Sequence, residues 1–167
     1  MERPLLLLDV DGPLNPFRAG RAPLPRGYLP HTIHGLRVLL DPAHGPALAA
    51  LPFDLVWATT WEHDANTEIA PRVGLPALPV ITWPVGADTA PGLCFKTPTV
   101  AAYTAGRPFA WVDDEVTDTD RAWLAARRDT PFLLHRVSAR RGLRPTDLAT
   151  LATWAATHAP DAAPIGD

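Results

Sequence analysis

Leu5-Leu6-Leu7-Leu8-Asp9-Val10-Asp11-Gly12 is the stretch that decides the fold of this chain. Its four leucines form a short, uninterrupted apolar run, and two aspartates and a glycine follow at once. A run of this length suits a strand that is buried on both faces, as in a parallel sheet, and the glycine favours a turn after it. We therefore predict a buried parallel strand over residues 4–10, with carboxylates at its carboxyl end.

Four further apolar runs of this kind follow along the chain, and helix-forming stretches lie between them. The predicted strands cover residues 53–60, 78–82, 108–112 and 132–137, and the predicted helices cover residues 42–51, 62–73, 97–103, 118–128 and 146–157. Strands that alternate with helices predict an α/β protein, a three-layer α/β/α sandwich around a central parallel sheet. In such sheets ligands bind beyond the carboxyl ends of the strands, where the strand order reverses.

One segment does not follow this alternation, because residues 13–40 are rich in proline and glycine. They contain two possible hairpin strands, over residues 27–33 and 36–40. We interpret the segment as a small flap over the site rather than a second domain. The length of 167 residues is that of one domain. We thus predict a single domain over residues 1–158 and a loose C-terminal tail over residues 159–167.

Composition sets limits on the function. The formal net charge is −3, so no overall positive field attracts the chain to nucleic acid or to an anionic membrane, although a nucleotide can still fit a local pocket. Cys94 is the single cysteine, which excludes an internal disulfide and argues against a thiolate zinc cluster. The sequence shows neither a secretory signal nor a run of about 18 apolar residues. We expect a cytoplasmic protein with no membrane partner, and the sequence does not indicate an obligate protein partner.

Polar side chains gather at the ends of the predicted strands and before one predicted helix. In chain order they are Asp9, Asp11, Thr59, Thr60, Lys96, Asp113 and Asp114. The fold would bring these residues to one rim of the sheet. The carboxylates would repel one another strongly without a cation, and hard oxygen ligands of this kind suit Mg²⁺, which also binds phosphate oxygens.

These motifs resemble those of the haloacid dehalogenase (HAD) superfamily of phosphotransferases. There the first strand ends in Asp-x-Asp-Gly, which is residues 9–12 here, and the second ends in a hydroxyl residue, here Thr59. A lysine follows, here Lys96, and then an acidic pair after an apolar strand, here residues 113–114. The order and spacing match over residues 5–118, about two thirds of the chain.

A narrower resemblance is to the small bacterial HAD domains related to the phosphatase modules of RNA-repair proteins. That branch has Asp-Val-Asp-Gly-x-Leu-Asn-Pro, as in residues 9–16, and Thr/Ser-x-Trp, as in residues 59–61. The resemblance implies the Rossmann-like HAD fold, with the flap of residues 13–40 instead of a large cap domain. Large caps usually select small metabolites as substrates, so a site without such a cap admits bulkier substrates. We expect a phosphorylated small molecule, or the phosphorylated end of a nucleotide or nucleic acid.

The resemblance also implies a mechanism. Asp9 would attack phosphorus and form an aspartyl-phosphate, while Asp11 would protonate the leaving oxygen and then deprotonate the attacking water. Thr59 would hydrogen-bond a phosphate oxygen, and Lys96 would neutralise charge on the nucleophile and the phosphoryl group. Residues beside these are expected to contact substrate, namely Gly12, Thr60 and Trp61.

The same resemblance implies a magnesium site. Mg²⁺ would be bound by Asp9, by the backbone carbonyl of Asp11 and by one acid of the pair Asp113 and Asp114. The sequence does not distinguish the two members of that pair. An alternative alignment makes Asp114 and Asp118 the acidic pair, with Asp113 at a position where the family has glycine.

Other functions use the same residue types. A receiver domain of a signalling protein places its acceptor aspartate at the end of the middle strand, but residues 78–82 contain no acid. A pseudoenzyme would keep the pocket only to bind phosphate or a partner. A dehalogenase is disfavoured because Asp11 is present, and a P-loop kinase because no Gly-x-x-x-x-Gly-Lys-Ser/Thr occurs. The sequence thus predicts a magnesium-dependent phosphomonoester hydrolase.

Overall fold

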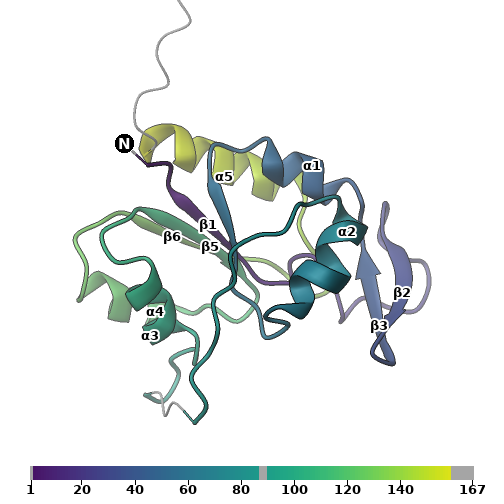
Figure 1. Cartoon of the computed structure of the whole chain (residues 1–167), viewed down its shortest axis with the longest axis horizontal. Coiled ribbons are helices and arrows are strands. Elements are labelled where there is room, and N and C mark those ends of the chain that lie inside the picture. Colours follow the sequence, from purple (N-terminus) through teal and green to yellow (C-terminus); the bar gives the residue numbers. More distant parts are fainter. Residues whose placement is uncertain (1, 87–89, 159–167) are drawn as a thin grey trace, which may run out of the picture.

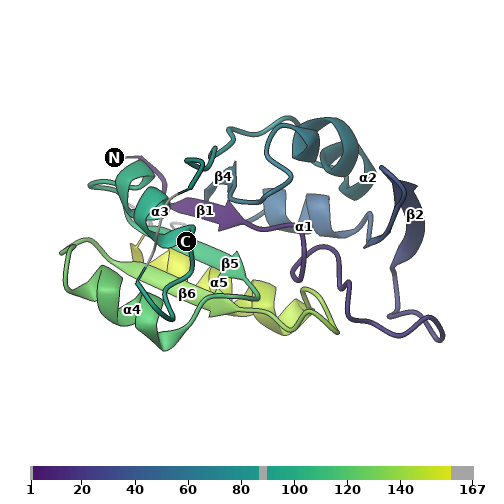
Figure 2. The same ribbon diagram turned by 90° about the horizontal axis from the view of Figure 1, so that it is seen from below.

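A parallel sheet of four strands forms the centre of the computed structural model, which describes residues 2–86 and 90–158 (Figure 1 and Figure 2). The strands are β1 (Leu5–Leu8), β4 (Asp54–Trp57), β5 (Phe109–Asp113) and β6 (Phe132–Arg136). Their order across the sheet is β4-β1-β5-β6, and every neighbouring pair is parallel. The predicted α/β class and its parallel central sheet are confirmed.

Helices cover both faces of this sheet (Figure 1). One face carries α1 (His44–Ala49), the π-helix η1 (Ala65–Ile69), α2 (Ala70–Val73) and α5 (Pro145–His158). The other face carries α3 (Thr97–Tyr103) and α4 (Asp118–Ala125). Each helix therefore buries an apolar side against the strands.

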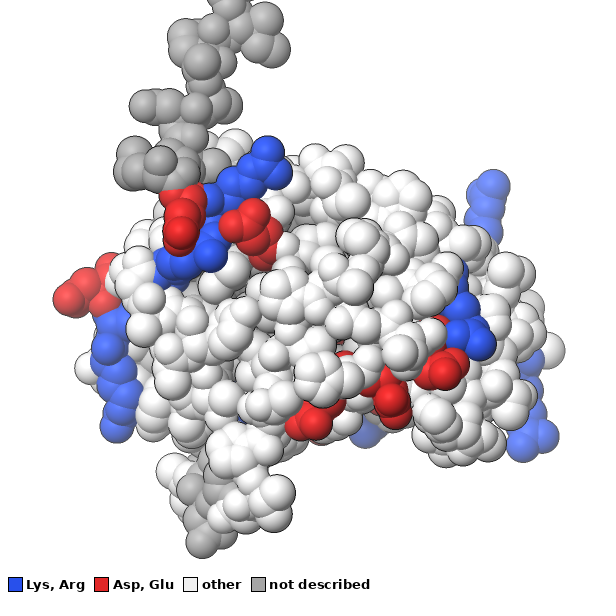
Figure 3. Space-filling view, in the orientation of Figure 1, with Lys and Arg blue, Asp and Glu red and all other residues white. Residues whose placement is uncertain are grey.

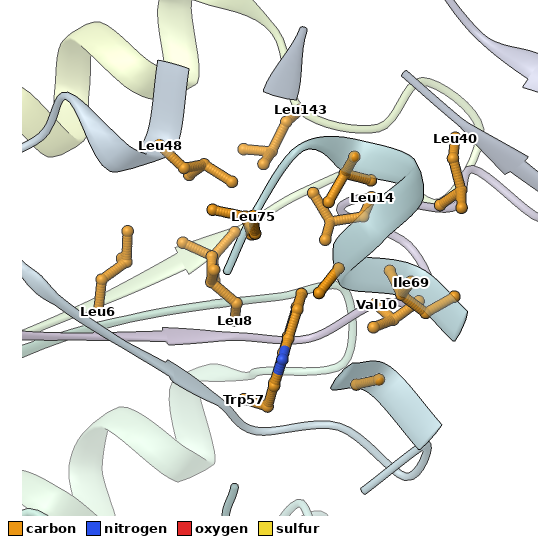
Figure 4. Packing of buried hydrophobic residues seen from close by; sticks show 14 of the residues in the cluster. Leu6, Leu8, Val10, Leu14, Leu40, Leu48, Trp57, Ile69, Leu75 and Leu143 are labelled. Carbon is orange, nitrogen blue, oxygen red and sulfur yellow. The ribbon is translucent and has the colours of Figure 1, made fainter. Parts of the chain in front are cut away.

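The leucines of β1 contribute to the core on both faces of the sheet, because successive side chains of a strand point to opposite sides. Leu6 and Leu8 pack in the cluster beneath α1 and α5 (Figure 4), and Leu5 and Leu7 pack in the cluster beneath α3 and α4. All four side chains are buried. Full burial of one leucine contributes roughly 1.5–3 kcal/mol, which explains why an unbroken leucine run forms the central strand.

The strand predicted over residues 78–82 is not formed. A single parallel bridge joins Trp57 to Val80, with one backbone hydrogen bond from Trp57 N–H to Pro79 and one from Ile81 N–H back to Trp57, both of 2.9 Å. The prediction of a full strand is wrong because proline has no N–H to donate, so the ladder cannot extend through this segment.

Several helices and strands begin or end at other residues than predicted. The helix expected over residues 42–51 begins at His44 instead, because the carboxylate of Asp41 accepts the Ala43 N–H (2.9 Å) in a turn and does not cap the helix. The helix expected over residues 62–73 is divided into η1 and α2. The helix expected over residues 118–128 ends three residues early, and the strand expected over residues 53–60 ends at Trp57.

Residues 13–40 contain the expected antiparallel hairpin, formed by β2 (Leu29–Ile33) and β3 (Leu36–Leu40). One side of the hairpin packs on the core through three apolar residues, Ile33, Val38 and Leu40. Both views place it at one end of the sheet, beyond the carboxyl end of β1 (Figure 1 and Figure 2). The hairpin thus lies next to the loop that carries the first acidic motif.

The surface and the helices add two further observations. Figure 3 shows basic and acidic side chains in small separate groups on a face that is mostly uncharged.

The longest helix of the described residues, α5, has 14 residues, and no helix in residues 2–86 and 90–158 combines the length and the apolar character of a membrane span. The tail expected over residues 159–167 lies outside the described residues.

Candidate active site

Two acids meet where the neighbouring strands β1 and β5 end. Asp9 follows β1 and Asp113 is the last residue of β5. The Asp9 N–H donates to the Val112 carbonyl (3.0 Å), so the two strand ends are held side by side. The strand order reverses at β1, because β4 lies on one side of it and β5 on the other. This is the place where open α/β sheets bind their ligands.

Lys96, in the loop before α3, joins these two acids. Its Nζ lies 2.8 Å from Oδ2 of Asp9 and 2.8 Å from Oδ2 of Asp113. All three residues are buried, and Lys96 is only 2% exposed. Although burial lowers the pKa of Lys96, the two carboxylates outweigh that effect and raise it. Lys96 is therefore a cation held by two anions.

The Asp9 carboxylate is fixed by several donors. Its Oδ1 accepts the Val10 N–H at 2.8 Å, and its Oδ2 accepts Lys96. Burial and the charge of Asp113 raise the pKa of Asp9 to about 8, because they outweigh the opposite effects of Lys96 and Thr59. One ammonium thus faces two carboxylates, and the excess negative charge is what a divalent cation would offset.

A third acid completes a set of candidate metal ligands. One carboxylate oxygen from each of Asp9, Asp113 and Asp114 lies within 4.8 Å of the other two. Both oxygens of Asp113 already accept hydrogen bonds, Oδ2 from Lys96 and Oδ1 from the Glu115 N–H at 2.8 Å. Burial, Asp113 and Glu115 raise the pKa of the partly exposed Asp114 to about 6.

Gly12 lets the first acidic loop approach Asp114. Its φ is +92°, a left-handed conformation that favours glycine. A Cβ atom at Gly12 would lie 2.6 Å from Cγ of Asp114, which no side chain can accommodate without a shift. The glycine therefore brings the loop after β1 against the acid after β5.

Asp11 has a different environment from Asp9. Its Oδ1 accepts the side-chain amide of Asn15 (2.7 Å) and its Oδ2 accepts the indole N–H of Trp61 (3.0 Å). The amide oxygen of Asn15 in turn accepts the Leu39 N–H of β3 (2.9 Å). The Asp11 carboxylate does not belong to the candidate metal ligands found among the described residues. The carboxylate is held on one side by Asn15, which is itself bound to the hairpin, and on the other side by Trp61 in the loop after β4.

The hydroxyl pair after β4 is divided between the interior and the surface. Thr59 is fully buried. Its hydroxyl accepts the Trp61 N–H at 3.3 Å and lowers the pKa of Asp9. Thr60 is exposed and faces the large cavity above the acids. The Ala58 N–H donates to the Leu8 carbonyl (2.8 Å), which keeps this loop beside Asp9.

A cavity of about 1010 Å³ opens over the acids and Lys96. Asp9, Asp11, Lys96 and Asp114 line this cavity. The rest of the wall includes three arginines and two phenylalanines, namely Arg18, Arg136, Arg140, Phe17 and Phe95. The carboxylates of Asp9, Asp11 and Asp114 and the ammonium of Lys96 are thus accessible from a space much larger than a phosphate group.

Two of the residues singled out in the sequence do not line the large cavity. The Asp118 side chain is fully exposed on α4, 4.0 Å from Arg121, and is not among the grouped acids. Trp61 lies on the hairpin side of Asp11, where it lines a smaller cavity with Leu36 and Val38. Asp9, Thr59, Lys96, Asp113 and Asp114 are brought together from four separate segments.

Sequence reasoning did not identify Asp120 as part of the site. This buried residue of α4 accepts the Cys94 N–H (2.9 Å) and the Thr97 hydroxyl (2.6 Å), on either side of Lys96. Its other oxygen accepts the N–H and hydroxyl of Thr117 (both 2.8 Å), forming a capping box. Thr117-x-x-Asp120 is a visible capping signal, but its link to the lysine loop is not visible in the sequence.

Comparison of the chain with protein-family models, with curated proteins and with solved structures gave no match. The chemistry of the site therefore rests on its residues. Grouped carboxylate oxygens suit a hard divalent cation, and a buried ammonium beside them suits an oxyanion. Together these groups can bind a phosphate through the cation and Lys96, next to a carboxylate able to attack it.

Proposed function

We propose that the protein is a magnesium-dependent phosphomonoester hydrolase of the HAD type, a three-layer α/β/α sandwich with the hairpin segment in place of a large cap. The observation that carries the proposal is the contact of Lys96 with both Asp9 and Asp113, each at 2.8 Å, from positions 87 and 17 residues away. A buried ion pair is often no more stabilising than an apolar replacement. Three buried charges at a ligand-binding edge therefore favour a chemical role.

The cation would be held by Asp9, Asp114 and the backbone carbonyl of Asp11. Asp114 is preferred to Asp113 because Asp114 is partly exposed and lines the cavity, whereas Asp113 is fully buried and accepts a hydrogen bond from Lys96. Mg²⁺ fits this set of hard oxygen ligands, and when bound it would offset negative charge on the phosphoryl group. Asp113 then has the separate role of orienting Lys96.

The reaction divides between Asp9 and Asp11. A carboxylate oxygen of Asp9 forms a bond to phosphorus while the bond from phosphorus to the ester oxygen breaks, and Asp11 gives that oxygen a proton. Asp11 then takes a proton from water as the water oxygen bonds to phosphorus and the Asp9–phosphorus bond breaks. Lys96 and Thr59 hold the nucleophile and donate to phosphoryl oxygens throughout.

Hydrolysis of p-nitrophenyl phosphate tests this proposal. The purified chain should release p-nitrophenol with Mg²⁺ and lose that activity with EDTA. Asp9→Asn should abolish the activity, and Asp118→Asn, which alters an exposed acid outside the site, should retain it. Circular dichroism of each variant checks that it is folded. Full activity in a folded Asp9→Asn variant would overturn the mechanism.

The same assay separates hydrolysis from phosphate acceptance without turnover. A phosphoacceptor module would be labelled stoichiometrically by acetyl phosphate and release no phosphate. A pseudoenzyme would bind Mg²⁺ or phosphate and show neither labelling nor release. Multiple turnovers with p-nitrophenyl phosphate are the expected result, and either of the other outcomes would contradict the proposed activity.

A further inference from the structure

The cavity of about 1010 Å³ is lined by basic as well as acidic side chains. Besides the acids Asp9, Asp11, Asp114 and Glu115, its wall includes Arg18, Arg136 and Arg140. Sites for drug-sized ligands have volumes of about 300–1,000 Å³, so this cavity holds far more than a phosphoryl group. The basic part of the wall is available to the rest of a substrate.

Backbone hydrogen bonds hold the basic side together. The Arg18 N–H donates to the Ala139 carbonyl (3.0 Å), which ties the segment after the first acidic loop to the segment that carries Arg140. Arg136 ends β6, and its Nε donates to the backbone carbonyl of Asp114 (3.0 Å). The three arginines therefore extend from the candidate metal ligand Asp114 outward to the segment after the first acidic loop.

These three guanidinium groups do not pair with the acids of the protein. In the part of the chain that the structure describes, the arginines that form ion pairs are Arg72, Arg107, Arg121 and Arg144. All three cavity arginines are exposed. Their remaining N–H donors are therefore accessible to a ligand in the cavity, and guanidinium groups recognise phosphate and carboxylate with two parallel hydrogen bonds.

Two aromatic side chains also line the cavity. Phe17 and Phe95 both line the cavity and are 45% and 40% exposed. Each directly precedes a charged residue of the cavity, Arg18 and Lys96 respectively. Exposed aromatic rings of this kind offer a surface for an apolar or ring-shaped body.

We infer that the preferred substrate is a phosphomonoester that carries a second anionic group, with a ring between the two. The ester phosphate would lie at Asp9, and the second phosphate or carboxylate would lie at Arg18, Arg136 and Arg140. This inference rests on the proposed phosphatase function and names its substrate class. A cavity with acids alone would repel such a substrate, whereas the three arginines supply positive charge on the same cavity wall.

Matched substrates test the second anion. Adenosine 3′,5′-bisphosphate is compared with the adenosine 3′- and 5′-monophosphates, and 4-carboxyphenyl phosphate with phenyl phosphate, so that the two pairs distinguish a phosphate from a carboxylate. We expect kcat/KM to be about tenfold or more higher for the doubly anionic member of at least one pair. The advantage should shrink as NaCl rises, because screening weakens exposed charge pairs.

Variants locate the effect. Arg140→Gln and Arg18→Gln should each reduce the ratio of kcat/KM between the paired substrates by about tenfold. Arg21→Gln, which neutralises an arginine of the same segment that is not part of the cavity wall, should leave that ratio unchanged. Equal kcat/KM within each pair, or an equal ratio in Arg140→Gln and Arg21→Gln, would overturn the inference.

A binding experiment keeps the inference independent of turnover. Calorimetric titration of Asp9→Asn with each adenosine phosphate measures affinity without hydrolysis, and the bisphosphate should bind about tenfold more tightly. Loss of this preference in Asp9→Asn/Arg140→Gln would support the arginine site even if the wild-type chain hydrolysed nothing. Hydrolysis of p-nitrophenyl phosphate without any preference would retain the proposed function and remove this inference.

Discussion

Lys96 shows at the scale of one residue how charge and burial combine in this protein. Its ammonium group lies between Asp9 and Asp113 with almost no access to water. Removal of one partner from a buried ion pair is far more costly than the pair is worth, because the remaining charges are left uncompensated. The interaction therefore makes the site depend on all three side chains at once.

Lys96→Met tests this dependence. We expect the free energy of unfolding to fall by about 3–5 kcal/mol without metal, because Asp9 and Asp113 then face each other in the interior. Mg²⁺ should recover part of that loss by supplying the missing positive charge. Urea denaturation with and without Mg²⁺ measures both effects. A loss below about 1 kcal/mol would show that these carboxylates do not need the lysine.

Trp61→Phe tests the role of the indole that holds Asp11. The change keeps an aromatic ring but removes the N–H that donates to Asp11 Oδ2. If the indole positions Asp11 for proton transfer, the variant should lose about tenfold more activity on alkyl phosphates than on p-nitrophenyl phosphate, whose leaving group needs little protonation. Trp123→Phe, on α4, is the control. Equal losses on both substrate types would assign Trp61 a purely structural role.

At the scale of elements, the loop that carries Lys96 is anchored to α4 by Asp120. Asp120→Ala would leave buried donors of Cys94 and Thr97 without an acceptor and would remove the cap of α4. We expect a loss of at least about 2 kcal/mol in unfolding free energy, together with a lower kcat. Asp118→Ala changes an exposed residue two positions earlier on the same helix and should change stability by less than about 0.5 kcal/mol. Similar losses in both variants would contradict the anchoring role.

The start of α1 gives the fold a pH dependence. His44 is buried, with Nε2 3.2 Å from the Leu143 carbonyl, Tyr28 edge-on to its ring, and no partner for Nδ1 in the described chain. Burial lowers its pKa, against the smaller effect of Asp41. Below about pH 6.5 the unfolded chain therefore binds a proton that the folded chain does not, and stability falls as the pH falls.

His44→Gln measures this contribution. The loss of unfolding free energy between pH 7.5 and pH 5.5 should be smaller in this variant than in the wild type, because the buried titrating group is gone. His63→Gln, at an exposed position, should keep the wild-type loss. Urea denaturation at the two pH values provides the comparison. An unchanged loss in His44→Gln would show that another group is responsible.

The elements that could be predicted are those whose sequence pattern is local. The unbroken apolar runs at β1, β5 and β6 identified their strands, and the positions of Asp9 and Asp113 followed from the strand ends. The hydrogen bonds that arrange the site connect distant residues, such as Trp61 with Asp11, 50 positions away. A single sequence carries no signal for such contacts, so the orientation of Asp11 could not be predicted.

At the scale of the whole molecule, the sheet explains why distant motifs share one site. The chain passes from β1 outward to β4 and then returns to β5 on the other side of β1, which leaves the carboxyl end of β1 between two neighbours. The hairpin packs beyond that end, β6 and the segment after it contribute Arg136 and Arg140, and the segment after the first acidic loop contributes Arg18. The acids, the lysine and the basic wall are thus consequences of one topology.

Capture of the phosphorylated residue tests the central claim most directly. The chain is mixed with p-nitrophenyl phosphate and Mg²⁺, quenched in acid within the first turnovers, and reduced with borohydride, which converts an aspartyl-phosphate to homoserine. Peptide mass spectrometry then locates the reduced residue. We expect reduction at Asp9 and only when Mg²⁺ is present. Reduction at Asp11 or Asp113, or hydrolysis that continues with no residue ever labelled, would contradict it.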